Sequence, residues 1–346
     1  MEAERHLEQK TEVTHEELKM KKIGRILIPV IFVLACIVPI CIKNTYYITV
    51  LNSAMITSIM VIGLNFVTGL SGQMNLGTAG IMALGAYTAG MVSTKFSFTP
   101  ILGMLCALAM GFIIGKVLGY PSLRVSGVYL AITTIGFTEV VRIIINNATS
   151  LTGGAGGLKE IPKIKLFGFI FDTPHKLFYF ILAMVVIVTF IAWRVVNSKW
   201  GRSMKAVRDN TEAAKAGGMD IAKIKILSFT MAAILGCLGG ALYAYQMGYI
   251  NPSTFTQAYS TNFVVMLIIG GSGSVAGSLI GGMVMTILPE VARFLENYYW
   301  LVASIITLLF IIFLPNGVIS LFVKTNSCSR LRIFKGGIKR VHHTKD

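Results

Sequence analysis

Long apolar runs separated by short polar segments are the dominant pattern of the chain. They cover approximately 24–42, 46–68, 75–94, 98–118, 125–146, 177–196, 225–247, 261–289 and 299–322. Most of them are close to the roughly 20 residues that a helix needs to cross a bilayer. The pattern predicts an all-α polytopic membrane protein with about eight to ten transmembrane helices.

The run 261–289 differs from the others, because it is too long for one comfortable span and too short for two. Glycine and serine residues interrupt it at 270–274. Non-helical backbone at membrane depth is tolerated where it is buried in protein or lines a cavity. We therefore expect two short or re-entrant helices here, with the chain back on the outer side at 290–297.

The basic residues predict the orientation in the membrane. Lys and Arg are concentrated in the tail 1–22, in the loop 197–224 and in the tail 324–346. Positively charged segments near helix ends stay on the cytoplasmic side. With the broken pair included, both tails are expected in the cytoplasm. They flank a transmembrane domain at 23–323, and the loop 197–224 within that domain is expected on the same side.

Composition excludes several classes of protein. Charged residues make up 13% of the chain and hydrophobic residues 54%, whereas soluble proteins carry about 25% charged residues. The net charge of +16 would suit nucleic acid only if it lay on a folded, water-exposed face, so no nucleic-acid partner is expected. The five cysteines lack metal-site spacing, and no metal or other cofactor is expected.

Titratable groups are nearly absent from the apolar runs, and no catalytic site is expected. Glu139 and Arg142 are the exception, since they lie three residues apart on one helix face and can pair inside the bundle. The pair can belong to a gate or substrate path, or it can be a structural ion pair near a helix end, which the sequence alone favours. The segment 111–117 lacks the spacing of a phosphate-binding loop, so this chain is not expected to hydrolyse ATP by that route.

Two polar, glycine-rich passages interrupt the apolar pattern. Amides and hydroxyls in them suit the lining of a polar pathway, although ordinary loops are the more frequent interpretation of either passage taken alone. The first covers 63–77 and the second 129–158. The candidate pathway residues are Asn65, Gln73, Asn75, Thr133, Thr134, Glu139 and Arg142.

A third passage, 198–220, has the signals of a short exposed helix. Asp209 or Asn210 can cap it, Glu212 falls in its first turn, and the glycines at 217–218 end it. A small-residue helix of this kind suits a groove in another protein. A solvated basic loop explains the passage equally well.

The three passages, in this order, closely resemble the permease subunits of bacterial branched-chain amino acid ABC transporters. The similarity covers about residues 45–320. It is carried by GLNFVTGLSGQMNLGTAGIMALGAYTAG at 63–90, YLAITTIGFTEVVRIIINN with SLTGGAGGL at 129–158, and SKWGRSMKAVRDNTEAAKAGGMD at 198–220. The resemblance implies an ABC importer permease fold.

In such permeases the third passage corresponds to the loop that contacts the ATPase, which implies a coupling role for Arg208, Asp209, Glu212, Ala213, Ala214 and Gly218. The Ile-x-Leu-Pro that follows in longer forms of this motif is missing here. The implied partners are two cytoplasmic ATPase subunits that hydrolyse ATP, a second related permease, an extracytoplasmic binding protein and membrane lipid.

The resemblance implies a location in the bacterial cytoplasmic membrane and import of leucine, isoleucine, valine or a related small polar solute. Two other interpretations stay open from the residues. An ion-coupled secondary transporter would use broken helices near the midplane, and a passive channel could use the glycine-rich segments as a filter.

Overall fold

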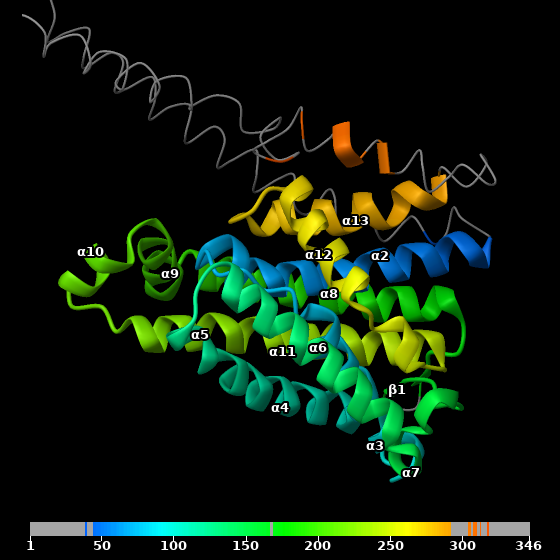
Figure 1. Cartoon of the computed structure of the whole chain (residues 1–346). Helices are drawn as coiled ribbons and strands as arrows, with labels where there is room; N and C mark the ends of the chain where they lie inside the picture. Colours follow the sequence, from blue (N-terminus) through cyan, green and yellow to red (C-terminus); the bar gives the residue numbers. More distant parts are fainter. Residues whose placement is uncertain are drawn as a thin grey trace, which may run out of the picture. The chain divides into compact units, whose positions relative to one another are not determined.

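The computed structural model describes residues 44–166 and 169–291, together with the isolated positions 39, 304, 305, 307–309, 312 and 317. The chain divides into two compact units, Met1–Thr49 and Val50–Asp346. Figure 1 shows that the larger unit is built from helices. All contacts discussed below lie within this larger unit.

The helices follow one another with mostly short connections, the longest being 153–173 between α7 and α8. They are α2 (Thr45–Leu64), the π-helix η1 (Asn65–Leu70), α3 (Thr78–Thr94), α4 (Pro100–Gly119), α5 (Pro121–Arg124), α6 (Val128–Asn147), α7 (Thr149–Thr152), α8 (Pro174–Val196), α9 (Lys199–Asp209), α10 (Thr211–Ala216), α11 (Ile221–Met247), α12 (Gln257–Gly270) and α13 (Val275–Val291). Two 3₁₀ turns lie at Gly154–Gly156 (η2) and Pro252–Thr254 (η3), and β1 (Lys165–Leu166) pairs antiparallel with β2 (Phe169–Ile170).

The predicted all-α membrane architecture is confirmed. In the described residues, five segments are long and apolar enough to cross a membrane: Thr45–Leu70, Pro100–Arg124, Val128–Asn147, Pro174–Val196 and Ile221–Met247. The apolar runs predicted between 46 and 289 all contain helix. The runs 24–42 and 299–322, the two tails and the return at 290–297 lie largely outside the described residues.

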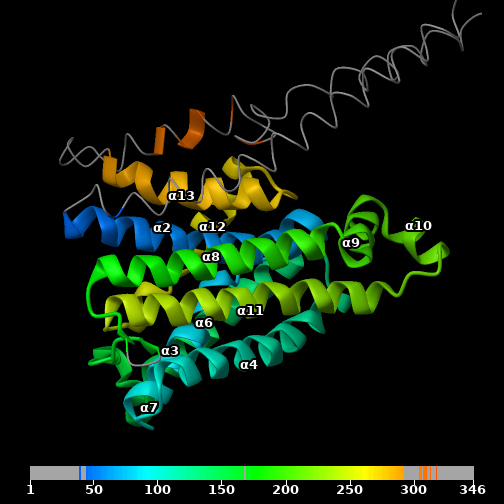
Figure 2. The same cartoon turned by 180° about the vertical axis from the view of Figure 1, so that it is seen from behind.

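Helix α11 lies at the centre of the packing, against α4 on one side and α3 on another (Figure 2). A glycine column on α4 permits the close approach. A Cβ added at Gly115 would lie 2.4 Å from the Cα of Thr230, and one at Gly111 would lie 2.7 Å from the carbonyl oxygen of Ala233. Small residues spaced four apart allow helix backbones to approach closely in lipid, and here they do so within one chain.

The break predicted in the run 261–289 is confirmed. Helix α12 ends at Gly270 and α13 begins at Val275, and Gly271 and Gly273 have φ angles of 110° and 85°. These values suit glycine, which lacks the Cβ that makes positive φ costly. The two short helices pack against each other. The turn between them, 271–274, is called the α12–α13 turn below.

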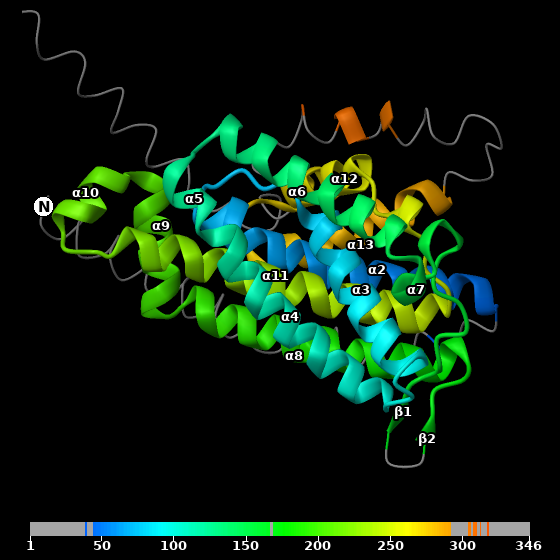
Figure 3. The same ribbon diagram turned by 60° about the horizontal axis from the view of Figure 1, so that its bottom comes forward.

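Helices α9 and α10 lie together at one end of α8 and α11, whereas α7 and the β1–β2 hairpin lie at the opposite end (Figure 3). The connection from α8 through α9 and α10 to α11 is the loop that the sequence predicts as cytoplasmic. It is called the α9–α10 segment below.

Candidate functional site

Local signals in the α9–α10 segment produce the short helix that the sequence predicts. The side chain of Asn210 accepts a hydrogen bond from the backbone N–H of Ala213, so Asn210 is the cap rather than Asp209. Gly217 follows the last helical residue, and Gly218 takes a φ of 78°. A glycine in this conformation is a common way to end a helix.

Most of α10 is presented to the exterior. Glu212 and Ala213 are exposed, and so is Gly218 just beyond the helix. Ala214 is only 5% exposed, because it faces the body of the protein. The exposed surface of α10 therefore combines alanine side chains with a carboxylate in the first turn and the Lys215 ammonium in the last.

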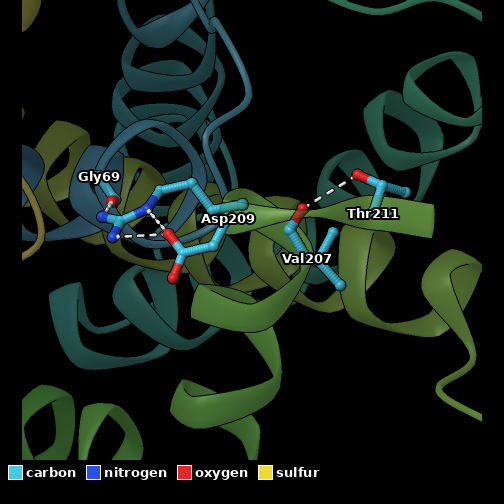
Figure 4. Close-up of polar contacts among 5 residues, drawn as sticks. Gly69, Val207, Asp209 and Thr211 are labelled. Carbon is cyan, nitrogen blue, oxygen red and sulfur yellow. Dashed lines mark hydrogen bonds and ion pairs between the residues drawn. The ribbon is translucent and has the colours of Figure 1, made fainter. Parts of the chain in front are cut away.

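The segment is joined to the bundle through Arg208. Its Nη1 donates to the carbonyl oxygen of Gly69 at 2.9 Å, and its Nη2 lies 3.1 Å from Oδ1 of Asp209. Figure 4 shows these contacts beside the bond from the Thr211 hydroxyl to the carbonyl oxygen of Val207, which joins α10 to α9. The candidate coupling residues thus include one that contacts η1 directly.

The carboxylate of Asp220 lies where the α9–α10 segment leads into α11. The carboxylate of Asp220 caps that helix by accepting from the backbone N–H of Lys223, and it also pairs with the Lys223 ammonium at 3.0 Å. These two interactions lower the pKa of Asp220 below its usual value. The capping carboxylate is therefore charged at neutral pH.

The amides of the first polar passage are buried, and each has an internal partner. Asn65 Oδ1 accepts from the backbone N–H of Gly273 at 2.8 Å. Gln73 Nε2 donates to the hydroxyls of Ser71 and Ser228, at 2.6 and 3.2 Å. These side chains hold η1 and the segment after it in place.

Asn75 and Thr134 serve together at the buried beginning of α3. Asn75 Oδ1 accepts from the N–H of Gly77 at 2.9 Å, and Thr134 Oγ1 on α6 accepts from the N–H of Leu76 at 3.0 Å. Ser260 on α12 accepts from the N–H of Ala79 at 3.0 Å. Ala79 lies in the first turn of α3, where N–H groups lack intrahelical partners, and Leu76 and Gly77 lead into that helix. The connection before α3, α6 and α12 supply the three acceptors.

The remaining candidates are on α6, and the described part of the chain leaves each of them at least partly exposed. Thr133 is exposed, whereas its neighbour Thr134 is 1% exposed. Glu139 and Arg142 form the predicted ion pair, with 2.8 Å between Oε2 and Nη2 and side chains 38% and 40% exposed. The seven candidate pathway residues therefore do not form one site.

Several partners escaped prediction from the sequence. Gly69 and Gly273 contribute backbone groups, for which the sequence carries no direct signal. Ser228 and Ser260 are single hydroxyls within apolar helices, so no spacing marked them. Among the described residues, no group of three His, Cys, Asp or Glu side chains is placed to hold a metal ion.

Comparison with known proteins gives the family. A model described as "Branched-chain amino acid transport system / permease component" matches residues 46–314. The chain is 31% identical over 293 residues to the high-affinity branched-chain amino acid transport system permease protein LivM of Escherichia coli K12, covering 77% of this chain and 68% of that protein.

More distant relatives carry other names. The fructose import permease protein FrcC of Rhizobium meliloti is 25% identical over 224 residues, 62% of each chain. The autoinducer 2 import system permease protein LsrC of Yersinia pseudotuberculosis is 25% identical over 258 residues, 72% of this chain and 71% of that protein. No solved structure matches the chain. The family match and the similarity to LivM show that this membrane protein belongs to the permease components of branched-chain amino acid transport systems.

Proposed function

We propose that this permease is driven by separate cytoplasmic ATPase subunits that dock on the α9–α10 segment. The observation that carries the proposal is the exposed surface of α10, with Glu212 and Ala213 outward and Gly218 beyond it, joined to the bundle through Arg208. A short exposed helix of this kind can enter a groove of a partner. Rigid attachment would then let movement of the partner reach the membrane helices.

The proposed orientation places the α9–α10 segment, the tail 1–22 and the tail 324–346 in the cytoplasm. Its support is the high content of Lys and Arg in these three segments, because segments rich in Lys and Arg near the ends of membrane helices are retained on the cytoplasmic side, whatever their content of Asp and Glu. The membrane is the bacterial cytoplasmic membrane, and residues 23–323 form the transmembrane domain. An extracytoplasmic binding protein would deliver solute to the opposite end of the helices.

The proposed translocation path runs along the uncovered face of α6, against a second, related permease. Glu139 lies near the middle of α6, and its ion pair with Arg142 is more than a third exposed. Charged groups facing lipid at this depth are costly, so such groups face other protein or a water-filled cavity. Thr133 is also exposed on α6, on the opposite side of the helix from Arg142, nine residues away.

The proposed solutes are leucine, isoleucine and valine. Support comes from the similarity to LivM at 31% identity, compared with 25% for the relatives named for fructose and autoinducer 2. Uptake of radiolabelled leucine into cells, with excess isoleucine, valine or fructose as competitor, tests this. Competition by fructose but not by valine would contradict the amino acid assignment.

The docking proposal is tested by Ala213→Asp. Ala213 is exposed, so an added carboxylate leaves the packing of the permease intact and adds charge and bulk to the proposed contact surface. Ala214→Asp is less informative, because Ala214 is buried. ATP hydrolysis by the affinity-purified complex should be lost in Ala213→Asp, as should uptake, while the amount of permease in the membrane is unchanged.

A matched control is Ala155→Asp, which introduces the same carboxylate at an exposed position in η2, remote in sequence from α10. It should retain the associated ATPase activity. Equal ATPase activity and uptake in Ala213→Asp and the wild type would overturn the docking proposal. Loss of uptake when the proton or sodium gradient is removed, with ATP maintained, would favour a secondary transporter. Ion conductance by the permease alone would favour a channel.

A further inference from the structure

A chain of contacts runs from the α9–α10 segment to the α12–α13 turn through η1. The guanidinium of Arg208 donates to the carbonyl oxygen of Gly69, a residue 139 positions away in the sequence. Asn65, one turn earlier in η1, accepts from the backbone N–H of Gly273 in the α12–α13 turn. Three separate elements are thereby held at one place, which is called the η1 link below.

The chemistry of the helix end explains why a guanidinium fits there. The last carbonyl groups of a helix have no intrahelical partner and carry partial negative charge. A cation at this position satisfies an otherwise unpaired acceptor, and hydrogen bonds to charged groups are stronger than neutral ones. Arg208 therefore stabilises the end of η1 from outside the helix.

Glycine is required where the parts of the η1 link pass one another. A Cβ at Gly72, whose φ is 69°, would lie 2.6 Å from Cγ of Arg208. A Cβ at Gly69 would lie 2.6 Å from the backbone nitrogen of Gly273. The arginine side chain and the α12–α13 turn are thus in direct steric contact with the end of η1.

The type of helix at this point is also informative. Residues 65–70 form a π-helix that continues α2 directly. Short π-helical turns within α-helices are rare and occur frequently at functional sites. Asn65 is 1% exposed and has its oxygen directed at the α12–α13 turn rather than at water.

We infer that Arg208 is a positioning residue that transmits movement of the α9–α10 segment through η1 to the α12–α13 turn. This inference rests on the proposed function, because it assumes that a partner moves the segment. When α9 shifts, the guanidinium must carry the Gly69 carbonyl with it or lose its bond. Asn65 then moves the Gly273 backbone, and with it the angle between α12 and α13.

The test follows the α12–α13 turn with a reporter thiol. Ser272 in this turn is exposed, so Ser272→Cys is introduced into a chain whose five native cysteines are replaced by serine or alanine. The rate of reaction with a membrane-impermeant maleimide is measured in inside-out vesicles. In the resting permease, Arg208→Gln should raise this rate about tenfold, the factor that corresponds to one lost hydrogen bond from a charged donor.

The same reporter is then read in the assembled ATPase complex. Trapping with ATP and vanadate should change the labelling rate in the wild type, and this change should be absent in Arg208→Gln although ATP is still hydrolysed. Leucine uptake per ATP hydrolysed should fall in parallel. Arg208→Lys, which retains one charged donor, should give intermediate values and serves if the glutamine variant does not fold.

A matched control is Arg194→Gln, which removes the same charge from an exposed position near the end of α8. In this variant, the reporter thiol should react with the maleimide at the wild-type rate, and trapping with ATP and vanadate should change that rate as in the wild type. Identical labelling and coupling in Arg208→Gln and the wild type would overturn the η1 link while leaving ATPase docking intact. Absence of ATP hydrolysis in every wild-type assembly would overturn the proposed function, and the inference with it.

Discussion

The carboxylate of Glu139 and the guanidinium of Arg142 lie 2.8 Å apart on successive turns of α6, in the second half of this 20-residue helix. Both side chains are more than a third exposed in the single chain. Among the described residues, each side chain is the ion-pair partner of the other. Their arrangement gives a direct test of what covers α6.

Removing one member of this pair should impair transport more than removing both. In Glu139→Gln, the Arg142 charge is left without its partner, and breaking a desolvated pair costs about 3–5 kcal/mol, whereas an exposed pair is worth roughly 0–1 kcal/mol. We expect leucine uptake to fall at least tenfold in Glu139→Gln and to recover partly in the double variant with Arg142→Gln. Uptake should be normalised to the amount of permease in the membrane. Wild-type uptake in both variants would contradict a covered, functional pair.

Neighbouring threonines on α6 provide a second test, because only Thr134 bonds to another element. The Thr133 hydroxyl donates to the carbonyl oxygen of Tyr129 in its own helix. Thr134 accepts from the backbone N–H of Leu76, and removal of a buried acceptor costs about 1–3 kcal/mol. Thr134→Val should therefore lower the midpoint temperature of thermal unfolding in detergent. Thr133→Val should leave this temperature unchanged, since exposed substitutions stay within about 0.5 kcal/mol.

For the rate of transport, in contrast to thermal stability, we expect the substitution of Thr133 to have a direct effect. If Thr133 lines the path, Thr133→Val should reduce uptake roughly two- to tenfold, the range that one hydrogen bond corresponds to. The measurement is the initial rate of leucine uptake in cells with equal permease content. Normal uptake in Thr133→Val would remove this residue from the path without affecting the role of Thr134.

The contrast between these threonines shows what the sequence can and cannot predict. Apolar runs of membrane length predicted the helices, and the glycine interruption predicted the α12–α13 turn, because both depend on local physics. The same reasoning grouped Thr133 with Thr134, because the sequence does not show which of two adjacent hydroxyls is covered by a neighbouring helix. The contact between Arg208 and Gly69 joins residues 139 apart, and no local pattern marks such a pair.

The π-helix at 65–70 was also beyond prediction. Its residues continue an apolar run without a charge or a proline, so they match an ordinary helical span. The wider turn is recognised only from the backbone, where Asn65 and the α12–α13 turn come together. By contrast, Asn210 and Gly218 have strong local preferences for capping and ending a helix, and the structure places α10 between them as predicted.

A third prediction concerns two glycines at which substitution by alanine should change the stability in opposite directions. In Gly115→Ala, the new methyl group would meet the backbone of Thr230 at 2.4 Å. Helices α4 and α11 would have to separate, at a cost of about 1–3 kcal/mol. Gly136 on α6 has open space where a Cβ would be placed, so Gly136→Ala should stabilise its helix by roughly 0.5–1 kcal/mol. In detergent, the midpoint temperature of thermal unfolding should be higher in Gly136→Ala than in the wild type, and lower in Gly115→Ala.

A fourth prediction concerns the hydroxyl of Tyr245, which joins three helices near one end of α11. It lies 2.8 Å from the hydroxyl of Ser93 on α3 and 2.9 Å from the carbonyl oxygen of Pro100 on α4. Tyr245 is 1% exposed, so Tyr245→Phe leaves these buried groups without their partner and should cost about 1–3 kcal/mol. Tyr129→Phe is the matched control. Tyr129 is 74% exposed, so the loss of its hydroxyl leaves no buried group without a partner. A lower unfolding temperature in Tyr245→Phe alone is expected. Equal temperatures in both variants would mean that water or a rearranged Ser93 satisfies the buried carbonyl, and that the three-helix junction is held by apolar packing.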